Sequence, residues 1–267
     1  MHAIAAQQTI PCYPPFSAAP IPQLHLSQTS AFVISFEDVL APMSFLAKRV
    51  GLQPTRSCLE AAKGAYGQDQ YLQQALTSVE EEAIALLRVA AAIGPVFVVT
   101  EKSIRYMETT CAAFFPRLAQ WLTSANTATS AQQFRVRVLA APQKFGNIME
   151  SSAWLARVYQ QIVKIVVCDA RGDATVTAAS LQLAHQMLQR RDSGALSLVS
   201  VSASSATQAA SIRTFDAAPF LIPKGVHVPG GDPSTALNLE HFFAQLRTLQ
   251  GYVGVAAAHR TAFSMSL

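Results

Sequence analysis

Side chains that could do chemistry follow the short apolar runs of this sequence, at the points where buried strands are predicted to end. They are hydroxyl and carboxylate groups, in chain order Ser35, Glu37, Asp38, Thr100, Asp169 and Asp173. A carboxyl group placed beside a substrate can donate or accept a proton during a reaction. A serine hydroxyl attacks a substrate only when a base lies next to it. The sequence therefore contains groups that could transfer protons or attack a substrate, provided that the strands bring these ends together.

Short runs rich in β-branched and aromatic residues predict the strands that would do so. We expect strands at residues 31–36, 96–100, 134–139, 164–168, 196–201 and 211–215. The patterns between them predict helices at residues 79–92, 103–115, 119–123, 152–162 and 174–189, and a last helix, capped by Asp232 or Ser234, that ends near Leu249. The glycines and prolines of residues 223–232 predict a loop.

Strands that are apolar throughout and alternate with helices are typical of a parallel sheet covered on both faces. We therefore predict a three-layer, Rossmann-like α/β fold with a parallel sheet. In such sheets, ligands bind outside the carboxyl ends of the strands. The segments to examine follow four strand ends, at residues 35–38, 100–102, 140–144 and 169–173.

The composition of the 267-residue chain excludes several classes of protein. Hydrophobic residues make up 51% and charged residues only 13%, which excludes a disordered chain and a coiled coil. The apolar stretches 90–100 and 162–168 are too short to span a bilayer. The net charge of +4 comes from scattered basic residues rather than from a basic stripe with aromatic residues between them. We therefore expect neither a nucleic acid nor a membrane as a partner.

The four cysteines are Cys12, Cys58, Cys111 and Cys168, with no CxxC pair and no histidine at the spacing of metal ligands. This pattern argues against a zinc site. Isolated thiols in a chain of this size are typical of a reducing compartment. We therefore predict no disulfide and a cytoplasmic location.

The first 36 residues contain no Asp, Glu, Lys or Arg, and five of them are proline. Prolines at this density prevent a helix and favour extended backbone. The segment has neither the basic start and apolar core of a signal peptide nor the arginines of a transit peptide. We interpret residues 1–29 as an extended arm, residues 30–250 as one α/β domain, and residues 251–267 as a C-terminal tail.

Segments at the predicted strand ends resemble, in the same order, the motifs of the haloacid dehalogenase-like (HAD) superfamily. The first motif of that family is a strand followed by Asp-x-Asp-x-Thr-Leu, and residues 34–40 read Ile-Ser-Phe-Glu-Asp-Val-Leu. The second motif, a strand that ends in Thr or Ser, is matched by residues 98–100. The fourth, an acidic pair after a strand, is matched by Asp169 with Asp173 four residues later. The resemblance implies a HAD-like core, with a minimal cap because only residues 41–78 separate the first two motifs.

One branch of the superfamily, found in plants and protists, is especially similar. Its second motif continues as Thr-Asn-Ala, then Gly-Trp-Val-Glu, then Phe-x-Pro-x-Leu. Residues 100–102, 105–108 and 114–118 follow one another here at the same intervals. The next strand of that branch ends Ile-Ser-Ala-Arg, and residues 138–142 stand in its place. The resemblance covers about residues 31–250.

The resemblance implies the chemistry of a phosphatase. In the superfamily, the first Asp of the first motif attacks phosphorus, and the second Asp protonates the leaving group and later activates water. A Thr or Ser and a Lys hold the phosphoryl oxygens, while Mg²⁺ binds between the nucleophile and the fourth motif. By position, Glu37 matches the second Asp and Thr100 the hydroxyl. Asp169 and Asp173, together with Glu37, would be the ligands of a weak Mg²⁺ site.

The nucleophile of the motif is missing from this chain. Ser35 stands in its place, and a serine is a poor Mg²⁺ ligand beside a carboxylate. Glu37 keeps an acid at the second position but is one methylene longer than Asp. Asp38 is charged, yet it is not at the position of the nucleophile.

The phosphate-binding lysine is also missing from its expected place. The family has Lys directly after a Trp, whereas here Trp154 is followed by Leu155. Lys144 or Lys102 could approach the pocket from other loops. The loss of a covalent nucleophile commonly removes several orders of magnitude of rate.

Several candidates also have a structural interpretation. Asp169 and Asp173 could cap the helix predicted from residue 174, and Ser103 is better interpreted as a helix cap than as a nucleophile. Residues 230–233 lack the lysine of a phosphate-binding loop and predict a turn. We interpret four histidines as surface or core residues: His25, His185, His227 and His241.

Together these features predict a catalytically degenerate HAD-like protein, a pseudophosphatase, that acts as a binding or scaffolding module for a protein partner. We expect no cofactor, apart from Mg²⁺ bound weakly if at all. The alternative is a Mg²⁺-dependent phosphatase-type hydrolase that uses Glu37, Asp38 or Asp169 in an altered arrangement.

Overall fold

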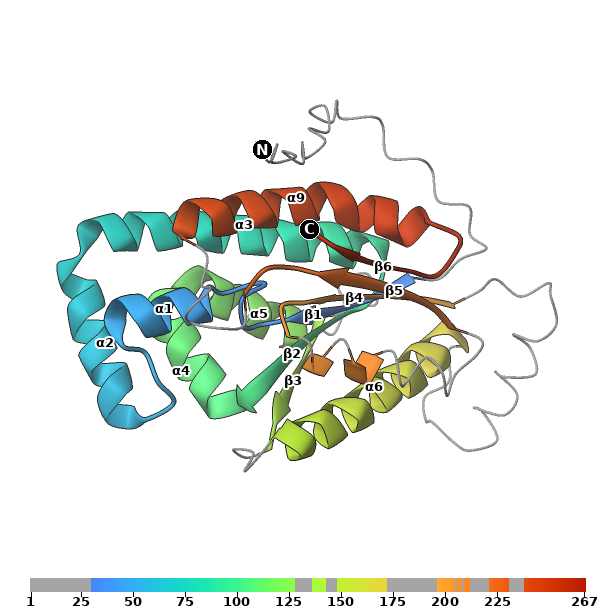
Figure 1. Cartoon of the computed structure of the whole chain (residues 1–267), viewed down its shortest axis with the longest axis horizontal. Coiled ribbons are helices and arrows are strands. Elements are labelled where there is room, and N and C mark those ends of the chain that lie inside the picture. The colour runs from blue at the N-terminus through green and yellow to red at the C-terminus, as the bar shows by residue number, and fades with distance from the viewer. Residues whose placement is uncertain are drawn as a thin grey trace, which may run out of the picture.

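The structure, a computed structural model, describes residues 30–127, 136–142, 148–171, 196–204, 206–207, 209–211, 221–230 and 238–267. In these stretches one sheet has the strand order β3-β2-β1-β4-β5-β6, and each neighbouring pair is parallel. The strands are β1 (Ser30–Ser35), β2 (Val96–Ser103), β3 (Val136–Ala141), β4 (Leu196–Ser202), β5 (Leu221–His227) and β6 (Phe263–Ser266). Helices cover both faces of the sheet (Figure 1), so the predicted Rossmann-like α/β fold is confirmed.

Strand β1 lies between β2 and β4, and all of its residues are buried. Ile34 pairs with Val98 of β2 on one side and with Val201 of β4 on the other. Successive side chains of a strand point to opposite faces, so Ile34 packs in one core and Val33 in the other. A strand buried on both faces is apolar throughout, which explains why residues 31–36 are recognisable as a strand.

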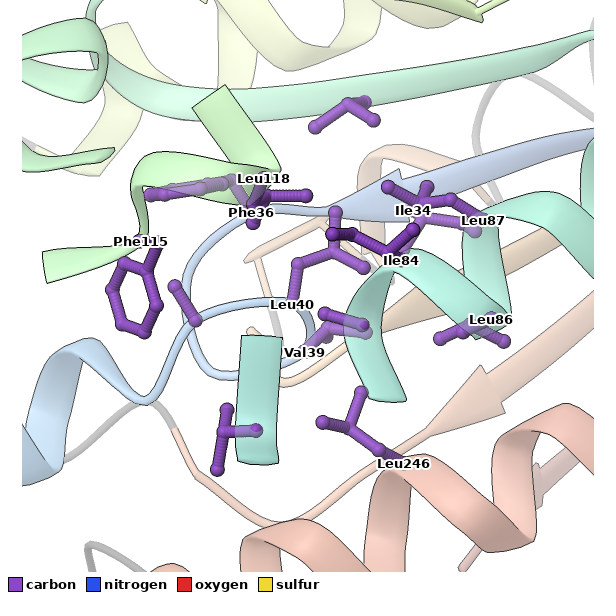
Figure 2. Close-up of a cluster of buried hydrophobic side chains, with 14 of the residues drawn as sticks. Ile34, Phe36, Val39, Leu40, Ile84, Leu86, Leu87, Phe115, Leu118 and Leu246 are labelled. Atoms are coloured by element: carbon purple, nitrogen blue, oxygen red, sulfur yellow. The ribbon is translucent and has the colours of Figure 1, made fainter. Parts of the chain in front are cut away.

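One face of the sheet is covered by α3 (Gln70–Ile93) and α9 (Leu239–Ala258), which lie side by side (Figure 1). Leu87 of α3 and Leu246 of α9 belong to the buried cluster that also contains Ile34 of β1 (Figure 2). The burial of this cluster is the main favourable contribution to the packing of both helices on the sheet.

The opposite face is covered by α6 (Ile148–Arg171) (Figure 1). Leu155, Tyr159 and Ile162 are fully buried and recur at helical spacing along it. The Tyr159 hydroxyl lies 2.6 Å from the hydroxyl of Ser200 in β4, so this buried pair is hydrogen-bonded. The second hydrophobic core lies between α6 and the sheet.

Four further helices in the described stretches are α1 (Met43–Val50), α2 (Arg56–Gln68), α4 (Ile104–Phe114) and α5 (Pro116–Thr127). Helices α1 and α2 follow the turn after β1 and precede α3. The segment 41–78 thus contains only α1, α2 and the first part of α3.

The strand predicted at residues 164–168 is wrong, because these residues lie inside α6. A short apolar run cannot be assigned to a strand or a buried helix by its composition alone. Helix α6 contains neither glycine nor proline to end it before this run. Buried Ile162 and Val166 continue the helical spacing of the buried residues before them. This spacing indicates a helix, whereas the β-branched composition of the run favoured a strand.

The place next to β1 is taken by β4, which overlaps the strand predicted at 196–201. The loop predicted at 223–232 is wrong for its first part, because β5 extends to His227. Pro223 argued against a strand inside the sheet, because proline has no N–H to donate to a neighbouring strand. β5 can contain Pro223 because the pairing of β5 with β6 begins only at the next residue, Lys224. Of the strand predicted at 211–215, Ser211 is helical and the rest lies outside the described residues.

Residues 251–267, which we expected to be a tail, form the end of α9 and strand β6 at the edge of the sheet. The arm predicted at 1–29 and the helix predicted at 174–189 lie outside the described residues. Cys58 and Cys111 are free thiols. Within the described ranges, no helix is both long enough and apolar enough to cross a lipid bilayer.

Candidate functional site

A cavity of about 490 Å³ lies at the carboxyl ends of β1, β2 and β4. Ser35 lines it from the end of β1, Glu101 and Lys102 line it from β2, and Ala203 and Thr207 line it after β4. Residues of α1 and of the loop before α2 contribute to the same wall. This is the edge at which ligands bind in open parallel sheets, so two of the four predicted segments, 35–38 and 100–102, meet at the expected position.

The chain turns sharply after β1. The backbone N–H of Phe36 donates to the carbonyl of Val99 at 2.8 Å, and the N–H of Ala41 donates to the carbonyl of Phe36 at 3.0 Å. Asp38 has a φ of 56°, in the left-handed region that Asp and Asn tolerate better than most residues. These bonds fix the direction in which the side chains after Ser35 leave the strand.

Asp38 holds this turn against α1. Its carboxylate accepts hydrogen bonds from the Ser44 N–H at 2.8 Å and from the Ser44 hydroxyl at 2.5 Å. The amide of Gln245 in α9 donates to the Asp38 carbonyl at 3.1 Å. A carboxylate is favourable at the N-terminus of a helix, and Asp38 is therefore a structural residue of the cavity wall.

Glu37 and Thr100 are brought together as the sequence predicted. The Thr100 hydroxyl donates to the Glu37 carboxylate and accepts the backbone N–H of Lys102 at 3.1 Å. Burial raises the pKa of Glu37 to about 7, although the Thr100 hydrogen bond and the charge of Lys102 act in the opposite direction. At neutral pH the Glu37 carboxyl group is therefore a mixture of its neutral and charged forms.

Glu101 connects three elements around the cavity. Its carboxylate accepts a hydrogen bond from the Ser151 hydroxyl of α6 at 2.6 Å and a longer one from the Ser204 hydroxyl after β4 at 3.5 Å. The Glu101 side chain thus links β2 to α6 and to the segment after β4.

Ser35 and Thr207 both line the cavity, although the two residues are only 8% and 3% exposed. Among the residues that the structure describes, neither hydroxyl has a hydrogen-bond partner. Buried hydroxyl groups are usually hydrogen-bonded. These two groups are therefore available to a molecule in the cavity.

The described residue of the predicted fourth motif, Asp169, does not line the cavity. The N-terminal part of α6 is at the site, where Ser151 contacts Glu101. Asp169 is 18 residues further along this helix, which places its backbone about 27 Å away at 1.5 Å per residue. Asp173 lies outside the described residues. The metal set of Asp169, Asp173 and Glu37 stays a prediction, and the backbone position of Asp169 argues against it.

The other candidates from the sequence analysis include residues at the cavity, residues away from it and residues outside the described part of the chain. Leu155 is fully buried in the core under α6, whereas Lys102 does line the cavity. Ser103 caps α4 by accepting the N–H of Tyr106 at 3.3 Å, so its interpretation as a cap is confirmed. His241 is exposed on α9. Four predicted candidates lie outside the described residues: Lys144, His25, His185 and most of the turn at 230–233.

The sequence analysis did not select Ser204, Thr207 or Tyr106, all of which line the cavity. Ser204 and Thr207 follow the run 196–201, which was recognised as a strand. The rule that ligands bind at strand ends would have selected them, but the resemblance matches the fourth motif to the residues after the run at 164–168.

The described residues do not fit a magnesium site. Mg²⁺ prefers carboxylate oxygens, but Ser35, Ala203 and Thr207 supply none. The three carboxylates that do line the cavity, those of Glu37, Asp38 and Glu101, already accept hydrogen bonds from Thr100, Ser44 and Ser151. The described part of the chain contains no group of three or more His, Cys, Asp or Glu side chains that could hold a metal ion.

We compared the chain with family models, with curated proteins and with solved structures. No family model, curated protein or solved structure matches it.

Proposed function

We propose that this protein is a degenerate HAD-like protein that binds a small polar molecule in the cavity after β1 and does not transfer phosphoryl groups. The resemblance of residues 34–40 and 98–100 to the first two motifs supports the family. The ends of β1 and β2, which contain these residues, lie side by side in the sheet. A bound molecule would make the module a ligand-dependent partner for another protein.

The observation that supports the loss of activity is the set of side chains at the carboxyl ends of β1 and β4. Ser35 has no carboxylate to attack phosphorus, and Glu37 is bound to Thr100. Ala203 and Thr207 supply no negative charge from β4. Phosphoryl transfer by this superfamily needs the charge and the nucleophile that these positions lack.

One observation favours the alternative, a hydrolase with an altered site. The pKa of Glu37 is about 7, which is suitable for a general acid or base at neutral pH. The cavity also contains Ser35, a hydroxyl that such a base could activate. The alternative therefore predicts activity that depends on both Ser35 and Glu37.

A generic aryl phosphate, assayed with and without Mg²⁺, separates the two candidates. We expect no release of the aryl alcohol above that of buffer with Mg²⁺, even at high protein concentration. Turnover that Glu37→Gln abolishes would support the hydrolase and contradict our proposal. Glu81→Gln is the control, because Glu81 is an exposed residue of α3 paired with Arg117 on α5 and is not part of the cavity.

A further inference from the structure

We propose that the cavity binds an uncharged polyhydroxy compound, of the size of a monosaccharide or a nucleoside, in preference to a phosphate ester. This inference rests on the proposed function as a binding module without phosphoryl transfer. The inference names the chemical class of the ligand. The loss of the catalytic residues alone does not determine this class.

At two described helix N-termini near the cavity, a backbone N–H group that could bind a phosphate already has a side-chain partner. Phosphates bind to free N–H groups at helix N-termini. At α1, the Ser44 N–H is bound by the Asp38 carboxylate at 2.8 Å. At α4, the Tyr106 N–H is bound by the Ser103 hydroxyl at 3.3 Å. A phosphate would have to displace these side chains, one of which carries a negative charge.

The charges that line the cavity also oppose an anion. The carboxylates of Glu101 and Asp38 line it, and Glu37 adds charge as the pH rises above about 7. Among the described lining residues, Lys102 is the single cationic side chain, and it is exposed at the rim. A phosphate dianion in the cavity would therefore lie near more negative than positive charge, which is unfavourable.

The groups left available in the cavity suit hydroxyl groups. The Ser35 and Thr207 hydroxyls have no partner among the described residues, and each can both donate and accept a hydrogen bond. The Glu101 carboxylate has more acceptor positions than its two serine donors occupy. A polyol can donate to Glu101 and exchange hydrogen bonds with both free hydroxyls.

Part of the cavity lining is apolar. Buried Leu52 lines it together with Met43 and with the half-buried ring of Tyr106. Small-molecule sites are usually lined by apolar and aromatic groups with a few polar groups that fix orientation, in cavities of about 300–1,000 Å³. The non-polar face of a sugar ring or a nucleobase would pack on these apolar groups, while its hydroxyl groups would bond to Ser35 and Thr207.

Binding can be measured by saturation-transfer NMR and calorimetry with matched pairs of compounds. The pairs are methyl glucoside with glucose 6-phosphate, ribose with ribose 5-phosphate, and adenosine with adenosine monophosphate. We expect at least one uncharged compound to bind, and its phosphate ester to bind at least about tenfold more weakly, which corresponds to about 1.4 kcal/mol. Equal or tighter binding of the esters, or no binding of any uncharged compound, would overturn the proposal.

Thr207→Val tests whether the compound occupies this cavity, because valine keeps the shape of threonine without its hydroxyl. We expect affinity for the uncharged compound to fall at least about fivefold, consistent with the loss of one hydrogen bond. The matched control is Thr77→Val on the exposed surface of α3, which should leave the affinity unchanged. Unchanged affinity in Thr207→Val would also overturn the proposal.

The outcome can be distinguished from a failure of the proposed function. An ester that binds tightly without being hydrolysed contradicts only the ligand class. An ester that the protein hydrolyses contradicts the proposed function itself.

Discussion

The hydroxyl of Thr100 donates a hydrogen bond to the carboxylate of Glu37, and this bond joins the end of β2 to the turn after β1. The two residues are 63 positions apart in the chain. Their contact holds the half-buried acid in the cavity that Ser35 also lines, where burial raises the pKa of Glu37 to about 7. The carboxyl group of Glu37 therefore affects both the stability of the fold and the chemistry available in the cavity.

The free energy of unfolding should depend on pH through Glu37. Because its pKa is raised in the folded protein from the ordinary 4.5, its contribution to stability is complete below about pH 4.5 and is lost as the pH rises to about 7. Glu37→Gln keeps an acceptor for Thr100 but cannot ionise. We expect this variant to be about 1–3 kcal/mol more stable than the wild type at pH 8 and about equally stable at pH 4.5, by urea unfolding.

The control for this prediction is Glu81→Gln, which replaces an exposed carboxylate of α3. Its stability should follow that of the wild type at both pH values. If the free energy of unfolding of Glu37→Gln also equals that of the wild type at both pH values, the raised pKa of Glu37 is contradicted.

The extent to which the sequence predicts this site depends on the element. The strands at 31–36 and 96–100 are apolar throughout, and their order along the chain predicts that Glu37 and Thr100 follow neighbouring strand ends. The run at 164–168 has the composition of a strand but continues a helix without a glycine or proline. Because the fourth motif was matched to the residues after this run, the residues after β4 were not recognised as part of the cavity.

Buried Glu80 should stabilise the contact between α3 and α5. It is 2% exposed, and its carboxylate accepts the Leu118 N–H, in the first turn of α5, at 2.6 Å. Glu80→Ala leaves this N–H without its acceptor, so we expect the free energy of unfolding to fall by about 1–3 kcal/mol. The adjacent Glu81→Ala should cost less than about 1 kcal/mol, because its ion pair with Arg117 is exposed. Equal losses in the two variants would contradict this role of Glu80.

Lys224 of β5 should contribute a second dependence of stability on pH. Its side chain is fully buried and donates to the Ala257 carbonyl near the end of α9 at 2.9 Å, and burial lowers its pKa from 10.5 to about 8. Between these two values the unfolded chain binds more protons, so raising the pH favours the folded state.

We expect the stability of the wild type relative to Lys224→Met to increase between pH 8 and pH 10. Lys63→Met, a change at an exposed lysine of α2, is the control for general effects of alkaline pH. A stability difference between wild type and Lys224→Met that stays constant across this range would contradict the lowered pKa.

Carboxylates placed at the ends of β1 and β4 should create a magnesium site. Ser35 and Ala203 line the same cavity at the ends of neighbouring strands. In Ser35→Asp/Ala203→Asp, the two charges should repel each other and lower the melting temperature in EDTA, and Mg²⁺ should raise it again. The wild type should hardly respond to about 1 mM Mg²⁺, because it lacks these ligands. A rise of several degrees in the wild type would show that our description of the metal ligands is wrong.

The central claim, that the cavity binds without transferring phosphoryl groups, is tested most directly under single-turnover conditions. A stoichiometric mixture of the protein and an aryl phosphate with Mg²⁺ can be followed by phosphorus NMR over hours, so that even a slow reaction is detected. We predict that inorganic phosphate forms no faster than in buffer and that no phosphorylated protein appears. Phosphate release that is lost in Ser35→Ala and in Glu37→Gln but kept in Glu81→Gln would contradict the claim.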